Sequence, residues 1–194
     1  GVSPTYAKEI LSKEFGEGLE NDLKKRKNNL FGILNGIDSD QFDPLKDPNL
    51  AARYNSKMLT NQSGKFSSVL EYKKAKEKNK IFLQKKINLP INPKIPLISL
   101  ISRITNQKGF DLFIEVFEKI VGLKNLQIVL LGTGDALMEK QLKKLSLKYP
   151  DRFSCQIKFD AKLANQIYAG SDFFLMPSKF EPCGLGQLIA MKYG

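Results

Sequence analysis

Short apolar runs alternate with longer amphipathic segments along the second half of the chain. The runs have the length of buried strands and predict four of them, at residues 97–102, 126–131, 153–159 and 173–176. After the first run, apolar side chains recur every three or four positions, and one helical face carries Phe110, Phe113, Phe117 and Ile120. Strands that alternate with helices through short connections predict an α/β fold, a Rossmann-like parallel sheet with helices on both faces.

Three further helices are expected between and after these strands. Asp135 and Asp160 stand where a carboxylate caps a helix, and the two helices are expected to end near Lys148 and Ala169. A last helix is expected over residues 184–193. Ligands of such sheets bind outside the carboxyl ends of the strands, which here carry the loops 103–109, 132–135 and 178–186, with Phe159-Asp160 as a fourth position.

The first half of the chain has a weaker pattern. Ser3-Pro4 ahead of residues 5–11 predicts a short capped helix, and a polar stretch follows to Asn29. The apolar run 30–34 predicts a strand that ends at an Asn-Gly turn. The remaining expectations are a loop with a short helix over residues 43–64, a helix over 65–86 and a linker-like break at Pro90, Pro93 and Pro96.

The net charge of +11 raises the question of nucleic-acid binding. Only four of the 31 basic residues are arginine, and the lysines are spread along a chain rich in asparagine. The densest stretch, 73–86, has Glu71 and Glu77 beside or within it and no run of aromatic residues on which bases would stack. A solvated helix face is therefore the favoured interpretation, and no nucleic-acid partner is expected.

The absence of histidine excludes His-based catalytic triads, His general bases and the usual zinc sites. Two cysteines make neither a disulfide framework nor a metal cluster, so no metal is expected. The apolar runs are too short to cross a bilayer, and the first residues show no signal peptide. The sequence thus predicts no membrane partner and a reducing, cytoplasmic location, or a plastid if the source is plant-like.

The loop 103–109 leaves one strand and enters a helix at the ligand edge of the predicted sheet. Arg103 offers a bidentate fork for phosphate oxygens, and Lys108 offers a mobile point charge. Gly109 lets the backbone come close at the helix start, where free amides favour anions. From spacing alone, two ordinary surface cations at a helix entrance remain an alternative.

The stretch 177–187 holds Glu181 in a loop braced by prolines. Its carboxylate can accept hydrogen bonds from hydroxyls, and the amides of Gly184, Leu185 and Gly186 open a helix toward a diphosphate or a sugar. An exposed acidic loop punctuated by glycine is the alternative. Cys183 is interpreted as a packing or contact residue, because the neighbouring carboxylate opposes thiolate formation.

Two glycine motifs are weak on their own. Asn35-Gly36 is an ordinary turn signal. Gly132-Thr133-Gly134 lacks the third glycine of a dinucleotide fingerprint and follows an inner strand.

Four stretches, taken together and in order, resemble the bacterial glycogen synthase and plant starch synthase family. They are 2–7 (VSPTYA), 34–38 (LNGID), 102–109 (SRITNQKG) and 177–185 (PSKFEPCGL). The last two are specific signatures, and the resemblance covers nearly the whole chain. It implies the GT-B architecture, in which two Rossmann-like domains enclose an active site in the cleft between them.

The resemblance also implies an activity, the transfer of glucose from ADP-glucose or UDP-glucose to the non-reducing end of an α-1,4-glucan with retention. Arg103, Lys108 and Glu181 are the implied catalytic residues. The two cations would hold the donor diphosphate and stabilise the leaving group without a metal or other cofactor. Glu181 would contact the glucose ring near the amides of Gly184 and Leu185.

The remaining site residues follow from the same resemblance and from the ligand edge. Asn35 is implied to line the cleft, and Phe159 falls where the family often has a tyrosine that packs on the base. The complete substrate-binding set is expected to be Asn35, Gly132, Thr133, Phe159, Cys183, Gly184, Leu185 and Gly186.

Two positions depart from the wider pattern. Ile189 stands where many retaining relatives carry a second glutamate, although the glycogen synthase branch itself often lacks it. Gly186 stands where the branch usually has a hydroxyl or amide side chain, which removes one side-chain contact to phosphate.

The resemblance divides the chain into residues 1–29, the end of the N-terminal acceptor-side domain with a linker, and residues 30–194, a nucleotide-sugar-binding domain truncated at its C-terminal end. A fragment of this kind is expected to be inactive without the N-terminal domain. Three alternatives stay open: another GT-B enzyme such as sucrose synthase or a sugar transferase to lipid or protein, an inactive nucleotide-sugar or glucan-binding module, and, distantly, a basic nucleic-acid-binding protein.

Overall fold

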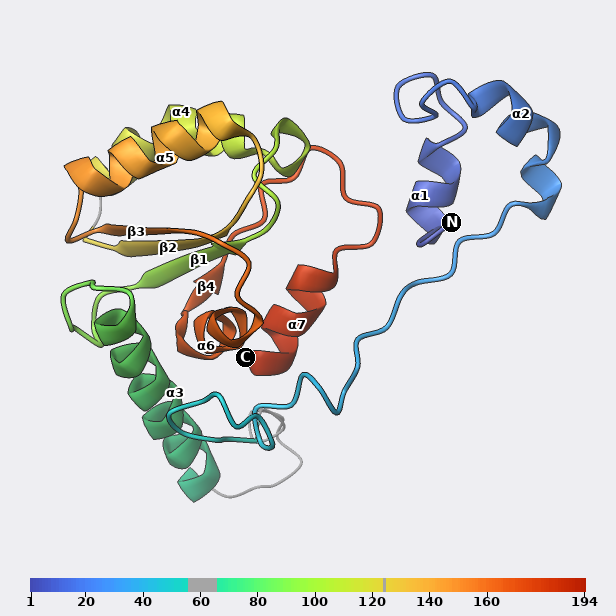
Figure 1. Ribbon diagram of the computed structural model, residues 1–194. Helices are drawn as coiled ribbons and strands as arrows, with labels where there is room; N and C mark the ends of the chain where they lie inside the picture. The colour runs from blue at the N-terminus through green and yellow to red at the C-terminus, as the bar shows by residue number, and fades with distance from the viewer. Residues whose placement is uncertain (56–65, 124) are drawn as a thin grey trace. The chain divides into compact units, whose positions relative to one another are not determined.

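The structure, a computed structural model, describes residues 1–55, 66–123 and 125–194 and separates into two compact units (Figure 1). The smaller unit consists of Gly1–Ile37 together with Phe180–Leu185. The larger unit consists of Asp38–Lys179 and Gly186–Gly194. The chain therefore passes from one unit to the other three times.

The larger unit is built on a sheet of four parallel strands in the order β3-β2-β1-β4. The strands are β1 (Leu97–Ile101), β2 (Gln127–Gly132), β3 (Phe153–Ile157) and β4 (Phe173–Phe174). All four lie within the runs predicted from the sequence or extend one residue beyond them, which confirms the α/β fold class. The predicted strand at 173–176 pairs over only two residues, Phe173 with Ile98 and Phe174 with Ser99.

The helices of the larger unit follow the sequence pattern closely. They are α3 (Phe66–Lys86), α4 (Phe110–Leu123), α5 (Ala136–Lys148), α6 (Ala161–Gly170) and α7 (Leu185–Tyr193). The Asp135 carboxylate accepts hydrogen bonds from the amides of Leu137 and Met138 at 3.0 and 2.9 Å. Asp160 accepts one from the Leu163 amide at 2.9 Å, so both predicted caps are confirmed.

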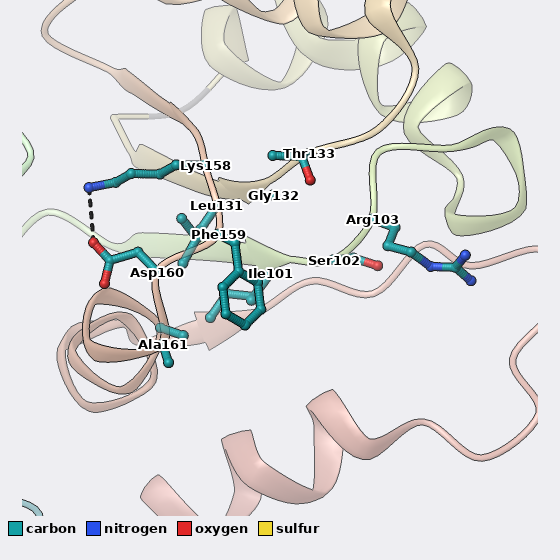
Figure 2. A pocket seen from close by; sticks show the side chains of 11 residues that line it. Ile101, Ser102, Arg103, Leu131, Gly132, Thr133, Lys158, Phe159, Asp160 and Ala161 are labelled. Atoms are coloured by element: carbon teal, nitrogen blue, oxygen red, sulfur yellow. Dashed lines mark ion pairs between the residues drawn. The ribbon is translucent and has the colours of Figure 1, made fainter.

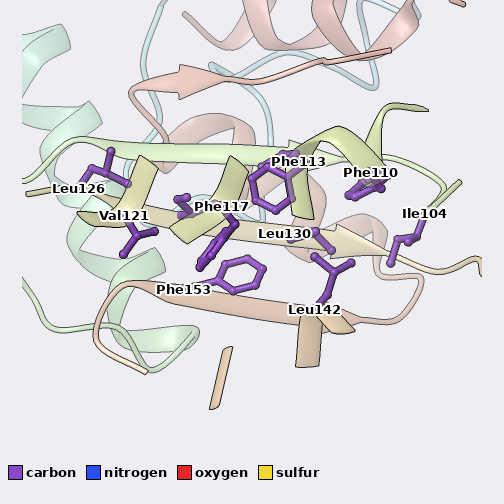
Figure 3. Close-up of a cluster of buried hydrophobic side chains, with 11 residues drawn as sticks. Ile104, Phe110, Phe113, Phe117, Val121, Leu126, Leu130, Leu142 and Phe153 are labelled. Atoms are coloured by element: carbon purple, nitrogen blue, oxygen red, sulfur yellow. The ribbon is translucent and has the colours of Figure 1, made fainter. Parts of the chain in front are cut away.

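Helices cover both faces of the sheet, α4 and α5 on one and α3 and α6 on the other, with α7 beside α6 (Figure 1). The alternation of β2 explains the two layers, because Ile128 and Leu130 pack under α4 and α5 while Val129 and Leu131 pack against α3 and α6. On the first face the rings of Phe117 and Phe153 lie 4.8 Å apart in the centre of the core (Figure 3).

The smaller unit begins with α1 (Pro4–Glu9), capped as predicted by the Ser3 hydroxyl, which accepts a hydrogen bond from the Tyr6 amide at 3.0 Å. The polar stretch that follows contains a helix that the sequence pattern did not indicate, α2 (Glu20–Lys25), and a 3₁₀ turn, η1 (Lys27–Asn29). The strand predicted at 30–34 is wrong. Its backbone is extended, but the hydrogen bonds described for it are two with Gly1 and one from the Leu30 amide to the Lys27 carbonyl in the preceding turn, and these do not form a ladder with another strand.

The loop 38–55 contains no helix, so the helix expected within 43–64 is absent from the described part of that range, and residues 56–65 lie outside the described residues. Aspartate side chains explain the turns. Asp38, Asp43 and Asp47 each accept a hydrogen bond from an amide two residues on, which competes with helical pairing. The prolines between residues 90 and 96 lie, as expected, in an irregular connection from α3 to β1.

Candidate functional site

A pocket of about 250 Å³ opens at the carboxyl edge of the sheet, beyond β1, β2 and β3 (Figure 2). Its lining consists of Ile101, Ser102, Arg103, Leu131, Gly132, Thr133, Lys158, Phe159, Asp160, Ala161 and Ala164. This is the edge at which parallel α/β sheets bind ligands. The structure thus brings together four residues that the sequence assigned to the site, namely Arg103, Gly132, Thr133 and Phe159.

One wall of the pocket depends on the close approach of two loops, residues 102–104 after β1 and residues 132–135 after β2. A Cβ atom on Gly132 would lie 1.9 Å from the Ser102 carbonyl oxygen, so only glycine fits there. The same loops are joined by a hydrogen bond from the Ile104 amide to the Thr133 carbonyl at 2.9 Å and by one from Asp135 to Ile104 at 2.8 Å. The glycines of this motif therefore let two backbones pack together and hold Thr133 beside the pocket.

Phe159 presents its ring to the pocket almost without cover. Its side chain is 93% exposed, which is unusual for phenylalanine. Figure 2 shows the ring beside Ile101, with the Lys158–Asp160 ion pair on one side of the pocket and Arg103 on the other. The Nζ and carboxylate of that pair are 3.0 Å apart. An open aromatic face next to apolar Ile101 and Ala161 offers a stacking surface for a flat ring.

The Asp160 carboxyl has two fixed partners. Its pKa is lowered below the usual range chiefly by the hydrogen bond from the Leu163 amide and then by Lys158. The group therefore stays ionised near neutrality, and its negative charge is shared with a cation and a helix start. Lys158 was missed in the sequence, although its place at the end of the third predicted strand is a position that lines such sites.

Arg103 leaves β1 at the mouth of the pocket with an exposed side chain. Lys108 lies at the end of the 3₁₀ turn η4 (Asn106–Lys108), and its residue is not among those that line the pocket. Gly109 then turns the chain into α4 with φ +73°. The loop therefore places its two cations at separate points, one at the pocket and one at the entrance to α4.

The stretch with Glu181 belongs to the smaller unit. The Phe180 ring stacks on Phe15 with centroids 4.7 Å apart and planes 8° from parallel, and it lies 5.6 Å from the Tyr6 ring. The residues of the expected site that lie in this unit are Asn35, Glu181, Cys183, Gly184 and Leu185. Those in the larger unit are Arg103, Lys108, Gly132, Thr133, Phe159 and Gly186.

Gly186 begins the part of α7 that belongs to the larger unit. A Cβ atom there would approach the Phe174 ring to 3.2 Å, a contact tight enough to require a small shift of the ring. Gly184 has φ +76°, a left-handed conformation that glycine adopts without strain. Glycine is therefore favoured at these two positions for different reasons, the ring contact at Gly186 and the backbone conformation at Gly184.

Within residues 1–55, 66–123 and 125–194, no group of three or more His, Cys, Asp or Glu side chains is arranged to hold a metal ion. No helix in the described part of the chain is both long and apolar enough to cross a membrane. Burial raises the pKa of the Cys155 thiol to about 12, which makes it an inert packing residue.

A family model described as "Glycosyl transferases group 1" matches residues 95–194, just over half of the chain and all of the sheet. The chain belongs to this family of glycosyltransferases. The match includes both signature stretches, the loop after β1 and the Glu181 segment.

Individual relatives align along the whole of this chain. The chain is 49% identical over 193 residues to a glycogen synthase of Clostridium perfringens and 50% identical to one of Lactococcus lactis. Both alignments cover 100% of this chain and 37% of the relative, so the chain spans little more than a third of these proteins.

A solved structure supports the same resemblance. The catalytic domain of starch synthase IV from Arabidopsis thaliana, bound to ADP and acarbose, superposes with a TM-score of 0.84 at 36% identity. The match covers 99% of this chain and 37% of that one. The resemblance to glycogen and starch synthases and the Rossmann-like fold predicted from the sequence are thereby confirmed.

Proposed function

We propose that the chain is the donor-binding part of a glycogen or starch synthase that transfers glucose from a nucleoside diphosphate glucose to an α-1,4-glucan. The observation that carries the proposal is the near 50% identity to glycogen synthases along the whole chain. The pocket at the carboxyl edge of the sheet supports it, because an open aromatic ring and an arginine line the same cavity. ADP-glucose is the proposed donor, since the structural neighbour binds ADP.

In this proposal the pocket binds the nucleotide. Phe159 stacks on the base, and Thr133 with the backbone of Gly132 lies beside the ribose and phosphates. Arg103, at the mouth, grips the diphosphate in a bidentate contact. Lys108 adds a second positive charge from the loop that enters α4.

The proposed reaction breaks the bond between the anomeric carbon and the diphosphate oxygen. The 4-hydroxyl oxygen of the glucan end bonds to the same carbon, with retention, and its proton passes to the departing diphosphate. Negative charge grows on the leaving group, and Arg103 and Lys108 stabilise it electrostatically. Glu181 accepts hydrogen bonds from glucose hydroxyls, with the Gly184 and Leu185 amides nearby and Asn35 and Cys183 as further contacts.

We assign residues 1–29 to the end of an acceptor-side domain and residues 30–194 to the nucleotide-sugar-binding domain. The smaller unit, which consists of Gly1–Ile37 with Phe180–Leu185, supports a division in the first part of the chain. Because the chain matches only 37% of its relatives, we propose that activity requires the remaining N-terminal domain.

The test uses the complete protein that contains this chain. Transfer of labelled glucose to glycogen is measured with ADP-glucose and with UDP-glucose, and ADP binding is measured by calorimetry. Incorporation from ADP-glucose is expected. Binding without incorporation from either donor would identify an inactive nucleotide-sugar-binding module, and neither binding nor transfer would reject the proposal.

A further inference from the structure

Three contacts join the loop after β1 to residues 177–179, which follow β4 and come just before Glu181. The Lys179 ammonium forms an ion pair with the Asp111 carboxylate in the first turn of α4. The Lys179 amide donates a hydrogen bond to the Gln107 carbonyl at 2.9 Å. The Pro177 carbonyl lies against Gly109, where a Cβ atom would come within 2.1 Å of it. Residues 103–111 and 177–179 therefore form one connected block within the larger unit.

The positive charge of Lys179 is already paired with a carboxylate inside this block. By sequence position alone Lys179 is a third cation near the proposed diphosphate site, two residues before Glu181. In the structure its ammonium is bound by Asp111, and its hydrogen bond lowers the pKa of that carboxyl. Asp111 also lies where the amides of a helix start favour negative charge.

We propose that Lys179 and Asp111 are a positioning pair for the proposed transfer reaction, and that Lys179 is not a third phosphate ligand. The pair holds Arg103 and Lys108 in register with the point at which the chain turns into the Glu181 segment. This inference rests on the proposed function, because the pair has a catalytic consequence only if the loop binds the donor. Its structural part, the fastening of the two segments, stands independently.

The pair is suited to positioning rather than to stability. Both side chains are partly exposed, at 47% for Lys179 and 35% for Asp111, and ion pairs of that exposure contribute little to folding. Geometry at a reacting centre is far more sensitive, since a displacement of about 1 Å can cost roughly 100-fold in rate. Loss of the pair should therefore slow turnover much more than it lowers the melting temperature.

The kinetic test is a double-mutant cycle in the complete protein with Lys179→Met, Asp111→Asn and both together. Each single variant is expected to lower kcat by about 10–100-fold with a smaller change in the donor KM, and the double variant to be no worse than either. Lys179→Arg should restore most of the rate. A phosphate ligand gives another pattern, with a large rise in donor KM for Lys179→Met alone and near wild-type kinetics for Asp111→Asn, and this result would overturn the proposal.

The matched control is the ion pair of Lys148 with Glu118, which joins α5 to α4 at 2.6 Å with similar exposure and lies outside the site. Lys148→Met and Glu118→Gln should leave kcat and KM unchanged. A comparable loss of kcat in these variants would show that any ion pair on α4 has the same effect, and would overturn the specific role of Lys179 and Asp111.

Amide hydrogen exchange separates this inference from the proposed function. In Lys179→Met and Asp111→Asn, exchange at the backbone amides of residues 179 and 109 should accelerate by about fivefold or more. These amides donate to the carbonyls of Gln107 and Asn106, which lie in the loop that the ion pair holds in place. The control pair should leave these amides unchanged. Accelerated exchange in a protein without transferase activity would reject the proposed function and retain the fastening, whereas unchanged exchange would reject the fastening itself.

Discussion

Phe159 and Gly109 have opposite surroundings in the larger unit. The Phe159 side chain projects into solvent beside a pocket, where it stabilises nothing in the core. Gly109 is buried, has a positive φ and faces the Pro177 carbonyl, so no side chain fits. At the scale of single residues, Phe159 is suited to ligand binding and Gly109 to the packing of the backbone. A substitution of Phe159 should therefore change the affinity for ADP, and a substitution of Gly109 should change the stability of the fold.

Replacing Phe159 with alanine should weaken ADP binding and leave stability unchanged. Stacking of a base on an aromatic ring contributes about 1–3 kcal/mol, so the Kd for ADP is expected to rise by roughly 5- to 150-fold. The control is Leu147→Ala, which removes a side chain of similar exposure, 81%, on α5 away from the pocket. Calorimetric titration and thermal unfolding of both variants check the prediction; an unchanged Kd for Phe159→Ala would remove Phe159 from the nucleotide site.

Replacing Gly109 with alanine should destabilise the fold. The new Cβ would lie within 2.1 Å of the Pro177 carbonyl oxygen at φ +73°, and backbone strain of this kind costs about 1–3 kcal/mol before the clash is counted. Gly122, in α4, is the matched control, because a Cβ there meets nothing within 4 Å. Gly122→Ala should stabilise by about 0.4–1 kcal/mol. In urea unfolding, the free energy of unfolding should therefore fall for Gly109→Ala and rise for Gly122→Ala.

Carboxylates at the starts of helices and turns shape the elements of this chain. Asp135 and Asp160 cap α5 and α6, and both were predicted, since the cap precedes a regular apolar pattern. The turns of the loop 38–55 were mistaken in part for a helix, because aspartates inside a polar stretch give no periodic signal. Helix α2 was missed for the same reason, as it buries none of its residues.

The cap of α6 provides a test of this reasoning. Asp160→Ala should lower the free energy of unfolding by about 0.5–2 kcal/mol near neutral pH, and Asp160→Asn by less, because asparagine also caps helices. The folded pKa of Asp160 is lowered, so the contribution of its charge is present above the unfolded pKa of about 3.9 and is lost as the pH falls through the folded value. Urea unfolding between pH 7 and pH 3 should show the free energies of unfolding of wild type and Asp160→Asn converging as the pH falls. A difference that stayed constant with pH would contradict a stabilising contribution from the charge of Asp160.

The whole larger unit depends on contacts between segments that are far apart in the sequence. The four strands, the helix order and the ligand edge could be predicted, because each rests on local periodicity and on the general behaviour of parallel sheets. The Lys179–Asp111 pair could not, because its partners are 68 residues apart and nothing local indicates which lysine meets which carboxylate. Nor did any pattern indicate that the buried Asp47 would join the loop 38–55 to α6 and α7.

Asp47 is the centre of a buried polar network. Its carboxylate accepts hydrogen bonds from the Tyr193 hydroxyl at 2.7 Å and from the Asn165 amide at 2.8 Å, and the Tyr54 hydroxyl donates to the Tyr193 carbonyl at 2.6 Å. Burial, together with the neighbouring Asp47, raises the pKa of Tyr193 above its usual value. The protonated hydroxyl is therefore the form that the folded protein favours.

Tyr193→Phe should lower the free energy of unfolding by about 1.5–3 kcal/mol near neutral pH, because it removes a buried hydrogen bond to a charged acceptor. Since the folded pKa is raised, this contribution is complete below the unfolded pKa of about 10 and is lost as the pH rises through the folded value. Urea unfolding should therefore show wild type and variant converging above about pH 10. Tyr6→Phe, which removes a hydroxyl from a half-buried ring of the smaller unit, should leave the free energy of unfolding unchanged. If Tyr193→Phe matched wild type at pH 7, the network would not be what holds the loop 38–55 to α7.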